Sequence, residues 1–265
     1  MKKSFITLTG ASALMVGAAQ AAVIFDATTA NITEVGNLNP TQLPTITGAT
    51  PDLIVTNASA NSHMGGFSST SDIQTLNGTA LTAADTVTIT LGVDSMTVGN
   101  LRANGVEFGL STTAGAFRPA GSLFIGMAGS NSGSDVRFVG GFNTSGSLDF
   151  NANQAALQDG FSITLTADVN GYSFLLEDIL VAGSTNPTYT NGDTSALITG
   201  TFTGTEFVDL FNSGHFYSAV QHQTAGAAMV TDYSTASIDV SVVPEPSSFA
   251  LFALSSLGLF RRRRA

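Results

Sequence analysis

Short stretches in which apolar and polar residues alternate fill the middle of the chain. In 86–91, Val87, Ile89 and Leu91 alternate with threonines, and 161–166 and 237–242 show the same period of two. This period predicts β-strands with one buried face. Less regular runs predict further strands at 52–56, 105–111, 121–128, 135–142, 171–180, 196–203 and 215–222.

The turn signals between these runs favour antiparallel pairing. Asn170-Gly171 follows the run 161–168, and Asn-Gly tolerates the positive φ that both central residues of a type I′ turn need. A two-residue hairpin is therefore expected there, and the only expected helix is a short turn around 153–158. Since no helices alternate with the strands, we expect an all-β fold, an antiparallel β-sandwich or jelly roll.

The serial order of the strands resembles that of concanavalin A-like (laminin G-like) sandwiches. The likeness is carried by the hairpin segment 159–174 and by a closing pair of strands at 215–222 and 235–243. Glycosidases with this kind of fold place two carboxylates on one strand face in a Glu-x-Asp-x-x-Glu pattern. That pattern is absent from the chain, which leads us to expect no enzymatic activity.

The first residues contain the three parts of a secretory signal. Lys2 and Lys3 precede an apolar stretch, which ends in the A-x-A site formed by Ala19 and Ala21. Cleavage after Ala21 would make 1–21 the signal peptide and would start the mature chain at Ala22. A retained anchor or a buried helix is the alternative.

The other end of the chain combines prolines, an apolar run and arginines. Pro244, Glu245 and Pro246 precede 247–260, an uncharged run of 14 residues. As a helix this run would be about 21 Å long at 1.5 Å per residue, against roughly 30 Å for a hydrocarbon core. It would be a short transmembrane helix, which suits a temporary anchor. The cluster that follows would stay cytoplasmic and consists of Arg261, Arg262, Arg263 and Arg264.

This order of parts resembles the PEP-CTERM sorting signal, here 244–265, and the likeness covers about 23 residues at the terminus. It implies recognition by an exosortase, a membrane protease-transpeptidase of Gram-negative bacteria that make exopolysaccharide. The protein would be exported, anchored transiently in the inner membrane and then delivered to the cell surface or extracellular matrix. A plain tail anchor with a chance Pro-Glu-Pro is the alternative.

Charge is distributed unevenly between the ends and the domain expected at 22–243. That segment holds three arginines, no lysine and 18 carboxylates, a net charge of −15. Nucleic acid is excluded as a partner, because it requires basic patches. The balance suits a hydrated protein in a medium rich in salt or calcium. The chain has no cysteine, and a domain of this size can fold without disulfides.

Candidate chemistry in the domain is sparse, and no cofactor is expected. The spacing of His63, His215 and His222 matches no zinc motif, and His215 and His222 should face opposite ways on one strand. A calcium loop is one reading of Asp149, Asn151 and Asn153, but the glycine and glutamate of an EF-type loop are missing. A polar turn before a helix cap explains these three residues equally well.

These observations favour a non-catalytic surface or matrix protein with a structural or adhesive role. Its expected partners are signal peptidase and exosortase as processing enzymes, the inner membrane and exopolysaccharide. The alternative is a lectin-like module that binds carbohydrate, although the chain has no tryptophan and only four tyrosines to stack on sugars. A glycoside hydrolase is the third hypothesis, and it would require a pair of carboxylates in a cleft.

Overall fold

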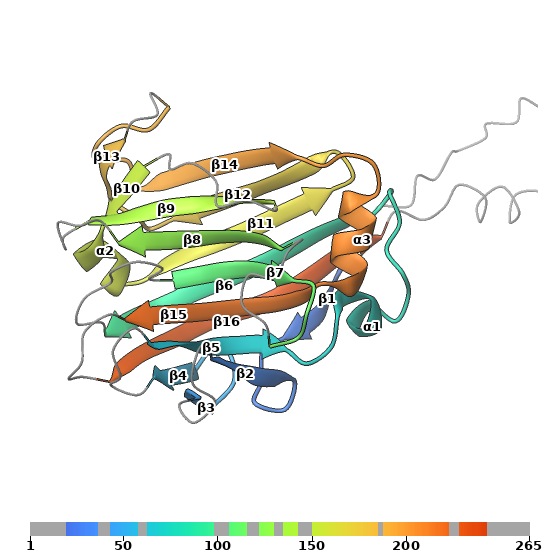
Figure 1. The fold of residues 1–265 in the computed structure, drawn as a ribbon, viewed down its shortest axis with the longest axis horizontal. Coiled ribbons are helices and arrows are strands. Elements are labelled where there is room, and N and C mark those ends of the chain that lie inside the picture. The colour runs from blue at the N-terminus through green and yellow to red at the C-terminus, as the bar shows by residue number, and fades with distance from the viewer. Residues whose placement is uncertain are drawn as a thin grey trace, which may run out of the picture. The chain divides into compact units, whose positions relative to one another are not determined.

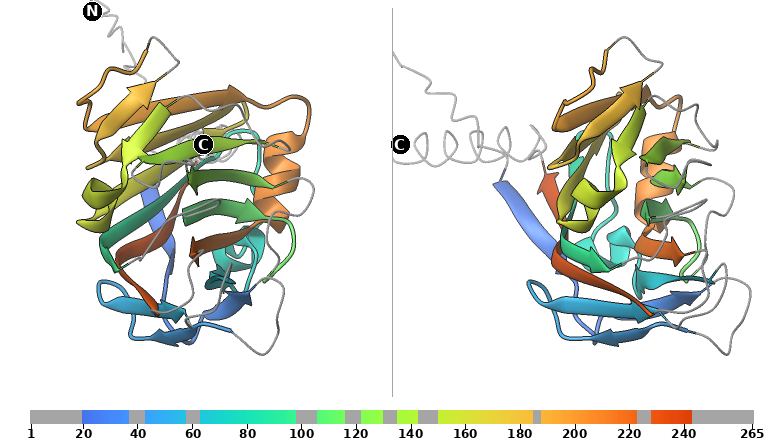
Figure 2. Two further views of the ribbon diagram at one scale, coloured as in Figure 1. Left: turned by 60° about the vertical axis from the view of Figure 1, so that its left-hand side comes forward. Right: turned by 90° about the vertical axis from the view of Figure 1, so that its left-hand side faces the viewer.

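Two antiparallel sheets of eight strands each form the described part of the protein in the computed structural model (Figure 1). Figure 2 shows the sheets as two layers. The structure describes residues 20–36, 43–57, 63–97, 106–115, 122–129, 135–142, 150–184, 188–222 and 228–242. Apart from their first and last residues, these ranges belong to one compact unit, Ala21–Ser241.

The first sheet has the order β14 (Ser195–Thr201), β12 (Gly171–Glu177), β11 (Phe161–Asp168), β6 (Thr86–Thr97), β16 (Met229–Val242), β4 (Leu53–Asn57) and β3 (Thr45–Thr47), with β1 (Gln20–Asp26) also paired to β16. The second sheet has the order β13 (Val181–Ser184), β10 (Phe150–Asn153), β9 (Asp135–Phe142), β8 (Leu123–Gly129), β7 (Val106–Ser111), β15 (His215–His222), β5 (His63–Ser69) and β2 (Ile32–Gly36). The expected all-β antiparallel sandwich is confirmed.

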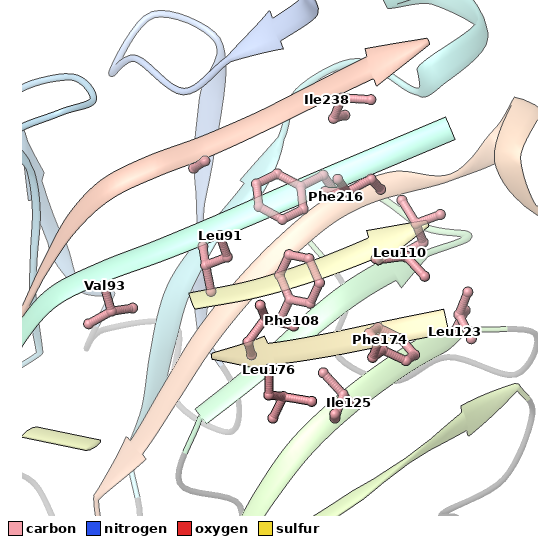
Figure 3. Packing of buried hydrophobic residues seen from close by; sticks show 14 of the residues in the cluster. Leu91, Val93, Phe108, Leu110, Leu123, Ile125, Phe174, Leu176, Phe216 and Ile238 are labelled. Carbon is pink, nitrogen blue, oxygen red and sulfur yellow. The ribbon is translucent and has the colours of Figure 1, made fainter. Parts of the chain in front are cut away.

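The core lies between the sheets and is built from the alternating residues. Val87, Ile89 and Leu91 of β6 are fully buried, while the threonines between them are not. Phe108 of the second sheet meets Phe174 of the first edge-on, with ring centroids 6.3 Å apart, and Phe216 at 5.6 Å. Figure 3 shows these rings among aliphatic side chains from both layers. Each strand thus contributes one face to a shared apolar interior.

The last two strands do not pair with each other, although the sequence suggested a closing pair. β15 lies between β7 and β5 in the second sheet, whereas β16 lies between β6 and β4 in the first. β16 is also longer than its alternating segment 237–242, because it begins at Met229. The chain therefore ends its fold on an interior strand of the first sheet.

The hairpin after β11 is confirmed, but its turn differs from the expected type I′ turn. Asp168 is paired with Gly171, so Val169 and Asn170 form the loop. Neither loop residue has positive φ; among the described non-glycine residues only Asp178 does. The Asp168 carboxylate holds the turn instead, accepting bonds from the backbone N–H of Asn170 at 2.7 Å and of Gly171 at 3.3 Å.

Gly171 is required by packing between strands and not by the turn. A Cβ at this position would lie 2.2 Å from the carbonyl oxygen of Gly200 in the neighbouring strand β14. The Asn-Gly pair therefore predicted the position of the hairpin correctly, although Gly171 is needed for packing against β14 and not for positive φ. Similarly, β5 was not expected because Gly65 and Gly66 interrupt its alternation, yet a Cβ on Gly66 would lie 2.0 Å from the Ser218 carbonyl oxygen of β15.

Helices are more numerous than expected. The expected turn around 153–158 is α2 (Gln154–Gln158), but α1 (Ile73–Asn77) and α3 (Glu206–Ser213) were missed. α3 buries Phe207, Leu210 and Phe211, the i, i+3, i+4 pattern of an amphipathic helix. These two helices lie at one end of the sandwich (Figure 1), where Phe211 packs against Phe202 with ring centroids 6.1 Å apart.

The expected signal helix and transmembrane helix fall on 1–19 and 243–265, which lie outside the described residues. None of the helices in the described ranges has the length and apolar character needed to span a membrane.

We predict that Asp168→Ala lowers the free energy of unfolding by about 1 kcal/mol, because the turn loses an acceptor shared by two N–H groups. Asn170→Ala is the matched control and should change stability by less than about 0.5 kcal/mol. Urea denaturation of the purified domain measures both. A greater loss of stability for Asn170→Ala than for Asp168→Ala would contradict this account and favour the type I′ turn.

Candidate functional site

The expected processing sites border the fold at its first and last strands. Ala19 and the motif Pro244, Glu245 and Pro246 lie outside the described residues, as does the tail 261–264. Ala21 lies in β1, where it and Ala22 are exposed. β16 ends at Val242, so only Val243 separates the last strand from Pro244.

The structure describes two of the three residues of the calcium hypothesis. Asp149 lies outside the described residues, and Asn151 is a ladder residue of β10, opposite Arg137. Asn153 is the N-cap of α2, and its side-chain oxygen accepts from the backbone N–H of Ala155 at 3.0 Å and of Ala156 at 3.2 Å. The described residues hold no group of three or more His, Cys, Asp or Glu side chains suited to a metal ion. This geometry fits the helix-cap interpretation.

Two of the histidines are brought closer together than the sequence suggested. His63 of β5 and His222 of β15 are register partners at the ends of their strands. His215, at the other end of β15, is partly buried, with Nδ1 3.1 Å from the carbonyl oxygen of Ser69. Only knowledge of the strand register could have revealed the pairing of His63 with His222, because 159 residues separate them in the chain.

Two glutamates of the domain, Glu107 and Glu177, lie on different sheets. Glu107 is fully buried in the second sheet, opposite Ala219 and Gly126. Glu177 is exposed at the end of β12 in the first sheet.

Glu206 and Asp209 belong to a helix that was not expected from the sequence. Both lie in the first turn of α3. Glu206 Oε2 accepts from the backbone N–H of Thr203 at 2.6 Å, and Asp209 Oδ2 accepts from Thr205 Oγ1 at 2.6 Å. These carboxylates complete the start of the helix.

Three carboxylates gather around the beginning of β16. Partial burial, then repulsion from Asp94 and Asp52, raises the pKa of Asp232 above its ordinary value of 3.8. Asp232 Oδ1 is buried and has no hydrogen-bond partner within the described part of the chain. The charged form of Asp232 therefore destabilises the folded protein at neutral pH.

The outward face of the first sheet carries an ordered array of hydroxyl groups that sequence reasoning missed. Residues directly opposite one another in antiparallel strands share a face, so the strand registers define two adjacent rows across β16, β6, β11, β12 and β14. The rows are Ser237–Thr90–Thr164–Leu175–Leu197 and Asp239–Thr88–Thr166–Ser173–Thr199.

Seven of these ten residues bear a hydroxyl, and Asp239 is the one charged residue among them. All ten are half-buried or exposed. The rows on either side of these two, on the same face of the sheet, add the carboxylates Asp168 and Glu177. The alternation that predicted the strands also contained this signal, since every second residue of 86–90 is threonine. We call these two rows the hydroxyl face.

We predict that Asp232→Asn raises the melting temperature at pH 7. Because the folded-state pKa of Asp232 lies above its unfolded value, ionisation favours unfolding as pH rises above about 3.8. The gain should vanish below that pH, where wild-type Asp232 is protonated in both states, and should shrink in high salt. Differential scanning calorimetry at pH 3 and pH 7 measures it, and equal gains at both pH values would contradict the electrostatic cause.

Residues 242–264 match the PEP-CTERM protein-sorting motif. No curated protein matches the chain. Among solved structures, lectin UEA-II complexed with galactose has a TM-score of 0.51 at 11% identity, covering 85% of this chain and 100% of that chain. Arcelin-5, a lectin-like defence protein from Phaseolus vulgaris, has a TM-score of 0.51 at 12% identity, covering 83% and 97%.

The CBM2 module of the evolved Dit of Lactobacillus casei BL23 phage J-1 also has a TM-score of 0.51, at 14% identity, and covers 84% of this chain and 97% of that chain. At such identities the likeness concerns the fold alone. The chain thus carries a PEP-CTERM sorting motif at its C-terminus, behind a domain that resembles the concanavalin A-like β-sandwich of legume lectins.

Proposed function

We propose that this protein is a non-catalytic surface or matrix protein, exported by its N-terminal signal and released from a temporary membrane anchor by an exosortase. The observation that carries the proposal is the match of 242–264 to the PEP-CTERM protein-sorting motif. The apolar run of 14 residues is short for a stable span and is followed by four arginines that orient it.

The properties of the folded domain suit export and delivery to the cell surface. Its net charge of −15 and its outward-facing hydroxyls keep it hydrated outside the cell. Some of its carboxylates serve caps and turns, as Asp168 and Glu206 do, and Glu107 is buried. We therefore assign the domain a structural or adhesive role.

In a host that carries an exosortase, protein recovered from the cell surface or medium should lack 249–264. Mass spectrometry of its C-terminal peptide measures this. Changing Pro244 and Pro246 to alanine should block recognition and leave the full-length chain in the inner membrane, since alanine allows a strand or helix to continue where proline does not. Ser247→Ala with Ser248→Ala is the matched control and should be processed normally. Surface protein that still contains 249–264 would make the tail a permanent anchor.

A second function, binding of neutral carbohydrate, is favoured by the hydroxyl face. The lectin-like fold makes such a role reasonable by analogy only. Hydroxyl groups donate and accept hydrogen bonds as sugars do, and nine of the ten residues in the two rows are uncharged. Leu175 and Leu197 at one end of the face offer an apolar contact, and Leu197 is 53% exposed. Each contact between the hydroxyl face and a sugar would be weak. Many copies of the protein on one surface would increase the overall affinity through avidity.

A glycan array probed with the 22–243 fragment tests this function. Binding to uncharged glycans should fall at least tenfold when Thr88, Thr164 and Thr166 are changed together to valine, which keeps their shape and strand propensity but removes three hydroxyls. The same positions changed to serine should retain binding, and Thr47→Val in β3 is the control outside the face. Unchanged binding by the valine variant would place the ligand elsewhere, and no binding to any glycan would reject this function.

A further inference from the structure

The hydroxyl face has the outline of a narrow ribbon that runs across the strands. Neighbouring strands lie about 4.8 Å apart, and side chains on one face of a strand repeat every two residues, about 6.7 Å. The five strands β16, β6, β11, β12 and β14 therefore give the face a length of about 19 Å and a width of two side chains. A ligand that fits this outline is long and thin.

Charge limits the direction in which such a ligand can run. Along the strands, the face soon reaches a carboxylate, because Asp168 on β11 and Glu177 on β12 lie in the adjoining rows. Across the strands, the row from Thr90 to Leu197 passes over β6, β11, β12 and β14 without a charge. Among the described residues, no further strand pairs with β14. A neutral chain can therefore lie across the strands and extend past the β14 edge of the sheet.

The side chains of the face combine polar and apolar groups in the way that a sugar ring does. Each threonine offers a methyl group beside its hydroxyl, as a pyranose offers C–H groups beside its hydroxyls. On β12 and β14, Leu175 and Leu197 lie opposite each other in one row, and Ser173 and Thr199 lie opposite each other in the other row. A sugar residue over these strands can place its C–H face on the leucines and its hydroxyls against Ser173 and Thr199.

Short side chains give the face little depth. Serine and threonine make up seven of its ten residues, and none of the ten is aromatic. A single sugar residue therefore contacts the side chains of only one or two strands and competes with water for their hydrogen bonds. A longer chain gains the contacts of all five strands, because the strand spacing is close to the length of one residue in an extended β-1,4-linked chain. A flexible chain can also follow the twist of about 20–25° between neighbouring strands.

We propose that the hydroxyl face binds a single extended chain of neutral, β-1,4-linked sugar residues, with about one sugar residue over each strand. This inference rests on the second proposed function, the binding of neutral carbohydrate, and specifies its ligand. The sugar hydroxyls exchange hydrogen bonds with the serines and threonines of the two rows. Asp239 within the face, and Asp168 and Glu177 beside it, repel acidic chains.

The length of the oligosaccharide tests this proposal on the unaltered protein. The experiment is isothermal titration calorimetry of the full-length chain, in a detergent without a sugar headgroup, with β-1,4-linked gluco- and manno-oligosaccharides from the monosaccharide to the hexasaccharide. In at least one series the affinity should rise at least tenfold from the disaccharide to the pentasaccharide and then level off, because only the first five residues each reach a further strand. Polygalacturonate, an acidic chain, should bind at least tenfold more weakly than the hexasaccharide of that series.

A change at one end of the face tests the direction of the chain. Leu197→Ala with Thr199→Ala removes the contacts of β14 alone, so the hexasaccharide should bind at least threefold more weakly while the trisaccharide binds as before. Thr88→Val with Thr166→Val, at the centre of the face, should weaken the binding of both. Thr201→Ala, one row outside the face on β14, is the matched control and should leave every affinity unchanged. Circular dichroism checks that each variant is folded.

Contrary results separate the inference from the function on which it rests. Equal affinities for the monosaccharide and the hexasaccharide, or for polygalacturonate and the hexasaccharide, would overturn the inference while leaving carbohydrate binding intact. A change at β14 that affects the trisaccharide and the hexasaccharide alike, or neither of them, would do the same, as would binding of other neutral glycans but of neither series. Absence of binding to both series and to every glycan of an array would reject the function and the inference together.

A second copy of the chain is the other possible occupant of the face. Sedimentation equilibrium of the full-length chain would then give twice the mass of the monomer, and Thr88→Val with Thr166→Val would restore the monomer mass. That result would overturn the inference, whereas a monomer mass for both chains agrees with it.

Discussion

Apolar packing between the two sheets is the interaction on which the rest of the structure depends. Phe108 and Phe216 from the second sheet and Phe174 from the first meet edge-on within about 6 Å. Burial of these faces contributes about 25 cal/mol per Å² of apolar surface. It also fixes the register, because a slip of one residue would turn Val87, Ile89 and Leu91 towards water and the threonines between them towards the core.

That fixed register has consequences on the outer surface of the first sheet and at the end of β16. It orders the threonines and serines of β6 and β11 into the hydroxyl face, and it sets the residue at which β16 stops. The likeness to lectins does not give the protein a ligand, since fold and site are separate properties. The proposals made for this chain therefore rest on two of its own features, the matched motif at 242–264 and the strand registers of the hydroxyl face.

The sequence predicted much of the fold because period-two alternation reports directly on burial. β9 and β15 begin and end at the expected residues, and β6, β11 and β16 were each found from a clean alternating segment. Elements without that signal were missed: β5 is interrupted by glycines that its neighbour β15 requires, and α3 is too short for its period to stand out among strands.

The turn at 169–170 and the pairing of His63 with His222 depend on register, which composition does not encode. Little of the candidate site was predicted, because the hydroxyl face exists only once five strands are aligned, whereas the sorting motif is linear and was identified from its residues.

The central proposal is that the chain is cut at both ends and released from its membrane anchor. The intact mass of the protein recovered from the surface of an exosortase-carrying host tests this most directly. The account predicts a mass for a chain that starts at Ala22 and lacks 249–264, allowing for any attached acceptor. A mass that includes 249–264 would contradict it.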